Sequence, residues 1–205
     1  MSLAACNWRC DSDFKRRFSA LRLLKLDMET ATLGGGCFWC LEAVYDEMHG
    51  VTSVESGYMG GRLENPDYHA VCTGKTGHVE VVQVTFDPEV TSYRDILEVF
   101  FAIHDPTSMD RQGNDSGTQY RSVIFTHSDE QQETAQRMIA ELDGEGIAAR
   151  PIVTQVRPAT KFFEAEEYHQ EYFKKNPGQG YCAMVVAPKL KKFREKFAAK
   201  RRAGA

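Results

Sequence analysis

The chain has 205 residues, of which 42% are hydrophobic and 26% are charged, and its formal net charge at pH 7 is −4. This size and composition predict one globular domain, and no stretch approaches the roughly 18 consecutive apolar residues of a membrane-spanning helix. Because the charge balance is slightly acidic, there is no general basic field, and we expect neither nucleic acid nor a membrane as partner.

The cysteine content indicates a reducing environment. Six cysteines are too few in so long a chain for a disulfide scaffold, so we expect a cytoplasmic protein in which any disulfide is transient and catalytic. The six are Cys6, Cys10, Cys37, Cys40, Cys72 and Cys182.

Three segments are expected along the chain. Residues 1–27 lack the uninterrupted apolar run of a secretory signal, and we predict an extension that is disordered or added to the natural chain. The main domain should span residues 28–188, and residues 189–205 should form a basic C-terminal helix and tail.

Strands and amphipathic helices alternate through the main domain. A short strand at 31–33 leads into a glycine turn, and the next segment has one apolar helical face at Leu41, Val44, Tyr45 and Met48. The later patterns predict strands at residues 51–58, 79–86, 120–126, 151–156 and 181–187, and helices that begin at Ser92 and Ser128 or lie at 165–172 and 189–202.

These elements predict a single α+β domain in which helices pack against one sheet. Residues 59–78 and 105–119 are long polar segments without periodicity. Long irregular segments inside a compact domain usually carry function, so we expect them to be functional loops.

The sequence GGGCFWC at residues 34–40 is the most informative part of the chain. It places Cys37 where a strand turns into a helix, among backbone N–H groups that lack a partner within the helix. The positive end of the helix dipole should lower the pKa of the thiol and favour the reactive thiolate. The glycines should let another molecule approach the backbone closely. Cys37 is therefore a candidate nucleophile.

Cys40 lies one helical turn after Cys37, and three interpretations of this C-x-x-C pair stay open. The position at a helix N-terminus favours a dithiol redox pair. A zinc site would need further ligands, and Cys72 with His69 or His78 matches zinc spacings poorly. The third interpretation is two cysteines packed in the core.

Glu80 is the second candidate for chemistry. It lies on the same face of its predicted strand as Val82, Val84 and Phe86. A carboxyl group on that apolar face should have a raised pKa, because desolvation disfavours its charged form, and could donate a proton at neutral pH. The alternative is a carboxylate at the strand end that turns toward solvent.

These residues belong to an ordered set of motifs that resembles the peptide methionine sulfoxide reductase A family. GCFW at 36–39 resembles the active-site motif of that family, and the likeness continues in order over residues 29–188. The chain departs from the commonest pattern at Cys40, where many members have glycine. The further motifs are SGYMGG at 56–61, NPDY at 65–68, VC at 71–72, TGHVE at 76–80, HDP at 104–106, RQGND at 111–115, GTQYRS at 117–122, FEAE at 163–166 and YHQ at 168–170.

The resemblance implies an α+β two-layer sandwich with a ferredoxin-like core and long functional loops. It also implies that residues 28–188 form a catalytic domain that reduces the S epimer of methionine sulfoxide, free or in proteins. Cys37 would be the nucleophile and Glu80 the proton donor.

The resemblance assigns substrate binding to five further residues. Phe38 and Trp39 would form an apolar wall for the methyl group of the substrate. Tyr68 and Tyr120 would hold the sulfoxide oxygen, and Asp115 would support binding and positioning.

The resemblance also implies how the enzyme is recycled. Cys37 would be left as a sulfenic acid, which a second thiol converts to a disulfide. Cys182 and Cys40 compete for this step, and we favour Cys182 because a mobile C-terminal segment could bring it to Cys37. Thioredoxin or a similar dithiol would then restore the thiols by exchange. No metal or organic cofactor is implied, and we expect a monomer.

Two other functions fit the C-x-x-C pair taken alone. One is a general dithiol oxidoreductase that acts on protein disulfides, and the other is a nonenzymatic zinc-binding module. Neither accounts for the motifs along the rest of the chain.

Overall fold

The computed structural model describes residues 27–146 and 150–204. The predicted N-terminal extension therefore lies outside the described residues, except for Asp27. Among the described residues, no helix combines the length and apolar composition that crossing a membrane requires.

Short strands and helices alternate along the described chain. The strands are β1 (Glu29–Gly34), β2 (Val51–Met59), β3 (Val79–Phe86), β4 (Arg111–Gln112), β5 (Asp115–Ser116), β6 (Val123–Thr126), β7 (Gln155–Pro158) and β8 (Phe163–Glu164). The α-helices are α2 (Phe38–Tyr45), α3 (Tyr68–Cys72), α4 (Tyr93–Ile103), α5 (Asp129–Gly144), α6 (Tyr172–Lys175) and α7 (Ala187–Lys196). The remaining helical turns are the 3-10 segments η1 (Thr118–Tyr120), η2 (Glu167–His169) and η4 (Ala198–Lys200) and the π-helical segment η3 (Cys182–Val186).

Six of the strands form the central sheet in the order β7-β6-β1-β3-β2-β8, and β4 pairs with β5 in a separate ribbon. Neighbouring strands of the sheet are antiparallel except β6 and β7, which are parallel. The succession β1-α2-β2-β3-α4-β6 with the sheet order β6-β1-β3-β2 is the ferredoxin-like arrangement. The predicted α+β sandwich with a ferredoxin-like core is therefore confirmed.

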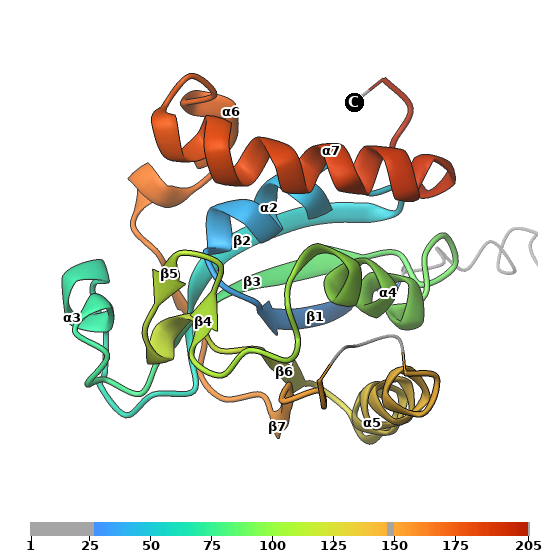
Figure 1. Ribbon diagram of the computed structural model, residues 1–205, viewed down its shortest axis with the longest axis horizontal. Coiled ribbons are helices and arrows are strands. Elements are labelled where there is room, and N and C mark those ends of the chain that lie inside the picture. The colour runs from blue at the N-terminus through green and yellow to red at the C-terminus, as the bar shows by residue number, and fades with distance from the viewer. Residues whose placement is uncertain (1–26, 147–149, 205) are drawn as a thin grey trace, which may run out of the picture.

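The helices cover one face of the sheet (Figure 1). α2 and α4 pack on that face, α7 packs across both of them, and α5 lies beside β6 and β7. The terminal basic helix is thus docked on the helical layer, where it buries Leu190 and Phe193.

The alternation of β3 divides its side chains between two apolar clusters. Val82 and Val84 belong to the large core under α2 and α4. Val79 and Val81 face the opposite side of the sheet, where they belong to a smaller cluster against which Ala159 and Phe162 pack. The period of two read from the sequence therefore places the two faces of this strand correctly.

Two predicted helix starts are confirmed by their caps. Ser92 and Asp95 form a capping box at the start of α4, in which the Ser92 hydroxyl accepts from Asp95 N at 3.1 Å and the Asp95 carboxylate accepts from Ser92 N at 2.9 Å. At the start of α5, the Ser128 hydroxyl accepts from Gln131 N at 3.2 Å. Each cap satisfies backbone donors that the helix leaves unpaired.

Two predicted elements in the last part of the chain are wrong. The predicted strand at 181–187 is the π-helical turn η3, which continues into α7; Pro188 is tolerated there because it lies in the first turn of that helix. The predicted helix at 165–172 is interrupted at Glu171, whose φ of +52° is left-handed, so η2 and α6 are separate turns.

The two long polar segments contain short elements that the sequence did not predict. Residues 59–78 include α3, which begins where the Asp67 carboxylate accepts from Ala70 N at 2.7 Å. Residues 105–119 include the ribbon of β4 and β5. The predicted strand at 120–126 begins only at Val123, because Tyr120 belongs to η1 and residues 121–122 link η1 to β6.

Candidate active site

Cys37 is the residue immediately before α2, as the sequence predicted. The turn that leads into it needs glycine for reasons internal to the protein. Gly36 has a left-handed φ of +93°, and a Cβ there would lie 2.8 Å from the Gln112 side chain. A Cβ at Gly35 would lie 2.7 Å from the Phe100 ring. The glycines at 35 and 36 therefore make room for the protein's own side chains.

The Cys37 thiol is only 6% exposed. Burial raises its pKa well above the usual value, and the neighbouring Cys40 and Glu80 side chains raise it further. The predicted lowering of this pKa by the helix dipole is therefore wrong for the substrate-free site. Desolvation of the thiolate outweighs a partial charge at the end of an eight-residue helix. The resting thiol is protonated at neutral pH.

The other cysteines of the described residues are also free thiols. Cys40 is buried on the same helical turn, and its hydrogen bond with Cys37 lowers its pKa. Cys182 is buried in η3, and Cys72 is exposed at the end of α3. Within the described part of the chain, no three His, Cys, Asp or Glu side chains gather as metal ligands.

Glu80 lies on β3, and its side chain is 1% exposed. Its carboxyl Oε2 accepts a hydrogen bond of 3.2 Å from Phe38 N, the first residue of α2. Burial raises the pKa of Glu80 to about 8, and this effect outweighs the lowering by the Phe38 bond. The predicted raised pKa is confirmed, and the alternative of a solvent-facing carboxylate is wrong. At pH 7 most molecules carry a neutral acid beside Cys37.

These groups line a cavity of about 270 Å³. It contains the predicted nucleophile, the predicted acid and all five predicted substrate-binding residues, whereas the two candidate resolving cysteines do not line it. The lining residues are Cys37, Phe38, Trp39, Tyr68, Glu80, Asp115, Tyr120, Gln179 and Tyr181.

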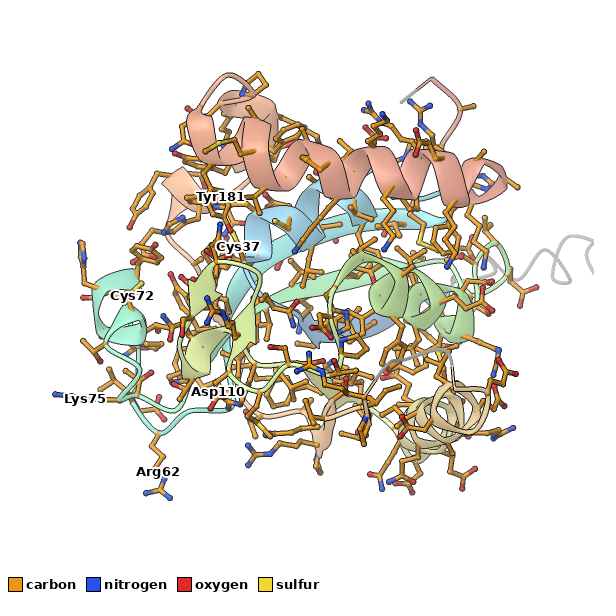
Figure 2. All side chains as sticks on the ribbon, viewed as in Figure 1. Cys37, Arg62, Cys72, Lys75, Asp110 and Tyr181 are labelled. Atoms are coloured by element: carbon orange, nitrogen blue, oxygen red, sulfur yellow. The ribbon has the colours of Figure 1, made fainter. Side chains whose placement is uncertain are left out.

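Tyr181 and Gln179 are the lining residues that the sequence analysis missed. The Tyr181 hydroxyl donates to Asp115 Oδ2 at 2.5 Å, and its ring meets Trp39 edge-on at 5.8 Å. Figure 2 shows Tyr181 beside Cys37, reaching the site from the far end of the chain. Tyr181 directly precedes Cys182, which the sequence marks as a candidate resolving cysteine. This tyrosine was the available signal.

The aromatic wall of the cavity is fixed from behind. Trp39 stacks on Tyr172 with ring centroids 3.8 Å apart and an interplanar angle of 8°. Its Nε1 donates to His169 Nδ1 at 3.2 Å. Tyr68, which also lines the cavity, is held by its backbone N–H, which donates to the Glu166 carboxylate at 2.8 Å. A wall held by stacking and hydrogen bonds keeps its shape when the cavity is empty.

The chemistry available to this cavity is attack by a sulfur atom on a small bound group while a neutral acid supplies a proton. A cavity that combines a thiol with a neutral acid in this way is the site of a thiol-dependent oxidoreductase. The model of the peptide methionine sulfoxide reductase family matches residues 29–201. The chain belongs to that family.

Known relatives agree in sequence and in fold. The peptide methionine sulfoxide reductase MsrA of Polynucleobacter asymbioticus is 61% identical over 170 residues, which cover 83% of this chain and 90% of the relative. The crystal structure of reduced Mxr1 from Saccharomyces cerevisiae matches with a TM-score of 0.69 and 36% identity, over 76% of this chain and 89% of that one. Mxr1 in complex with Trx2 matches with a TM-score of 0.50 and 27% identity, over 74% of this chain and 91% of that one.

Proposed function

We propose that this protein reduces the S epimer of methionine sulfoxide, free or in proteins, with Cys37 as nucleophile and Glu80 as proton donor. The observation that carries the proposal is that the thiol and a neutral carboxylic acid line the same small cavity. Phe38 and Trp39 supply an apolar wall for the substrate methyl group. Membership of the family and the named activity of its relatives support the same substrate.

The reaction follows from the protonation states of the two groups. Glu80 gives its proton to the sulfoxide oxygen, which is a poor leaving group until it is protonated. Cys37 sulfur bonds to the substrate sulfur and loses its own proton to the carboxylate so formed. In the resulting adduct the hydroxyl passes from the substrate sulfur to the Cys37 sulfur, so that one S–O bond breaks and another forms. The S–S bond breaks at the same time and returns its electron pair to methionine, which leaves as the thioether while Cys37 is left as a sulfenic acid. Tyr68 and Tyr120 hold the oxygen during this transfer, and Asp115 positions Tyr181 through their hydrogen bond.

A second thiol then displaces water from the sulfenic acid to form a disulfide. We propose Cys40 as the first partner, although the expected mobility of the C-terminal segment favoured Cys182. Cys40 already shares a hydrogen bond with Cys37, whereas Cys182 is buried in η3 and must move before it can react with Cys37.

Oxidised peptides can distinguish the two resolving cysteines. After one equivalent of substrate without reductant, mass spectrometry should detect a Cys37–Cys40 disulfide, both in the natural protein and in Cys182→Ser. In Cys40→Ser the sulfenic acid should persist, or Cys37 should pair with Cys182 at least about tenfold more slowly. A Cys37–Cys182 disulfide as the first product would contradict this order and restore the sequence-based preference.

A dithiol reductant of the thioredoxin type completes the cycle by thiol–disulfide exchange. The solved complex of the similar Mxr1 with Trx2 supports this partner. The reaction needs no metal or organic cofactor, since the substrate is the oxidant and a dithiol is the reductant. We propose that the protein acts as a monomer in the reducing cytoplasm.

The activity is tested by incubating the protein with the separated S and R epimers of methionine sulfoxide and dithiothreitol. We expect consumption of the S epimer alone, because one arrangement of wall and acid fits one configuration at sulfur. Equal consumption of both epimers would contradict the proposed site. Rapid reduction of insulin disulfides without sulfoxide turnover would indicate a general dithiol oxidoreductase instead.

A further inference from the structure

A second cavity of about 440 Å³ lies beside the active site and carries an excess of positive charge. We call this cavity the basic groove, because four cationic side chains and only one carboxylate, Asp110, line it. The cationic residues are Arg62, Lys75, Arg121 and Arg157. No ion pair involves any of the four cations among the residues that the structure describes. This local surplus stands out in a chain whose net charge is −4.

The basic groove is built on a fixed frame. Arg121 is buried, and its guanidinium donates to Thr118 O at 2.8 Å and to Gly77 O at 2.9 Å. The backbone N–H of Arg62 donates to Thr76 O at 3.0 Å, which ties the two loops of the groove together. Burial and the neighbouring Arg157 both lower the pKa of Arg121, so the like charges repel one another across the groove.

The three remaining cations face outward. Arg62, Lys75 and Arg157 are exposed. Figure 2 shows the Arg62 and Lys75 side chains extending from the edge of the molecule, on the side where α3 carries Cys72. Side chains spread in this way suit several carboxylates along a polypeptide better than one small enclosed anion.

The basic groove and the active-site cavity are lined by the same two segments of the chain. Tyr68 at the start of α3 lines the active site, and Gly74 just beyond the end of α3 lines the groove. In the same way, Tyr120 lines the active site and the next residue, Arg121, lines the groove. α3 and the turn after it separate Tyr68 from Gly74 by roughly 9 Å at the rise of a helix, a distance that an extended peptide crosses in about three residues.

We infer that the basic groove binds acidic residues located about two to four positions from the methionine sulfoxide of a protein substrate. This inference rests on the proposed function and adds a substrate preference to it: oxidised methionines in acidic segments should be repaired faster than those in neutral or basic ones. Free methionine sulfoxide cannot reach the groove and should be insensitive to it.

The preference is tested with S-methionine sulfoxide peptides of one length that carry Asp, Gln or Lys at the positions two to four residues from the sulfoxide. We expect kcat/KM for the acidic peptide to exceed that for the Gln peptide by about 3- to 10-fold, the range that a few exposed ion pairs supply, with most of the change in KM. The advantage should shrink at high salt, because exposed charges are screened.

The triple variant Arg62→Glu, Lys75→Glu, Arg157→Glu should reverse the preference in favour of the Lys peptide. Its turnover of free methionine sulfoxide should stay within about twofold of the natural protein, because the exposed side chains do not line the active site. Lys191→Glu on α7, an exposed cation away from the groove, is the matched control and should leave the preference unchanged.

Equal kcat/KM for the three peptides, with normal turnover of free methionine sulfoxide, would overturn the inference and leave the proposed function intact. An acidic preference that survives in the triple variant would also overturn it. Failure to reduce any sulfoxide would instead refute the proposed function.

Discussion

Replacing Glu80 by glutamine is expected to lower kcat/KM for methionine sulfoxide by about 100-fold or more, because glutamine keeps the shape of the side chain but supplies no acidic proton. In the natural protein, kcat/KM should fall as pH rises through about 8, where the carboxyl loses its proton. Stopped assays of thioether formation over pH 5–9 measure both effects. A Glu80→Gln variant with an unchanged rate and pH profile would remove Glu80 from the mechanism.

The same substitution should stabilise the protein at neutral pH. Burial raises the pKa of Glu80 from 4.5 in the unfolded chain to about 8, so the folded state retains a proton that the unfolded state loses between these values. Stability therefore declines as pH rises from about 4.5 to 8, by roughly 3 kcal/mol at pH 7. Glutamine has no proton to lose, so Glu80→Gln should lack this decline.

Glu42→Gln is the matched control for both measurements. Glu42 is also buried, and burial raises its pKa to about 7, but it does not line the active-site cavity. Urea unfolding at pH 5 and pH 8 should show a weaker pH dependence for each variant than for the natural protein. Sulfoxide turnover should fall far less in Glu42→Gln than in Glu80→Gln.

Replacing Cys37 by serine should reduce sulfoxide turnover to background, a loss of at least about 10⁴-fold. A hydroxyl group is a much weaker nucleophile than a thiol and cannot store the transferred oxygen as a sulfenic acid. The change conserves side-chain volume closely, so the circular dichroism spectrum and unfolding midpoint should be preserved. A coupled assay with thioredoxin, thioredoxin reductase and NADPH measures the loss.

Cys72→Ser provides the control for Cys37→Ser. Cys72 is exposed at the end of α3 and does not line the active-site cavity, so its replacement should retain most of the activity. Substantial turnover by Cys37→Ser, at more than about 1% of the natural rate, would mean that another cysteine attacks the substrate.

Local patterns predicted the strand that carries Glu80 and the start of one helix that packs on the sheet. β3 follows its two-residue alternation over its whole length, so the apolar face that holds Glu80 could be identified from residues on one strand. The start of α4 could be identified because Ser92 and Asp95 cap it through contacts three residues apart.

Properties that depend on distant parts of the chain escaped prediction. The pKa of Cys37 is raised by burial, and the depth of that burial depends on elements far along the sequence. Tyr181 reaches the cavity only because η3 and α7 pack against α2. The helix predicted at 165–172 is interrupted because the backbone of Glu171 is left-handed. This conformation could not be predicted from the sequence, since the position holds neither glycine nor asparagine.

The docking of Tyr172 and Tyr181 on Trp39 also has a consequence for biosynthesis. Cys37, the proposed nucleophile, leaves the ribosome early in the synthesis of the domain, whereas Tyr172 and Tyr181 leave it much later. A nascent chain therefore carries Cys37 through most of translation without the aromatic wall that stands beside it in the folded protein. The wall of the active-site cavity is complete only when residues 172–181 have emerged and packed against Trp39.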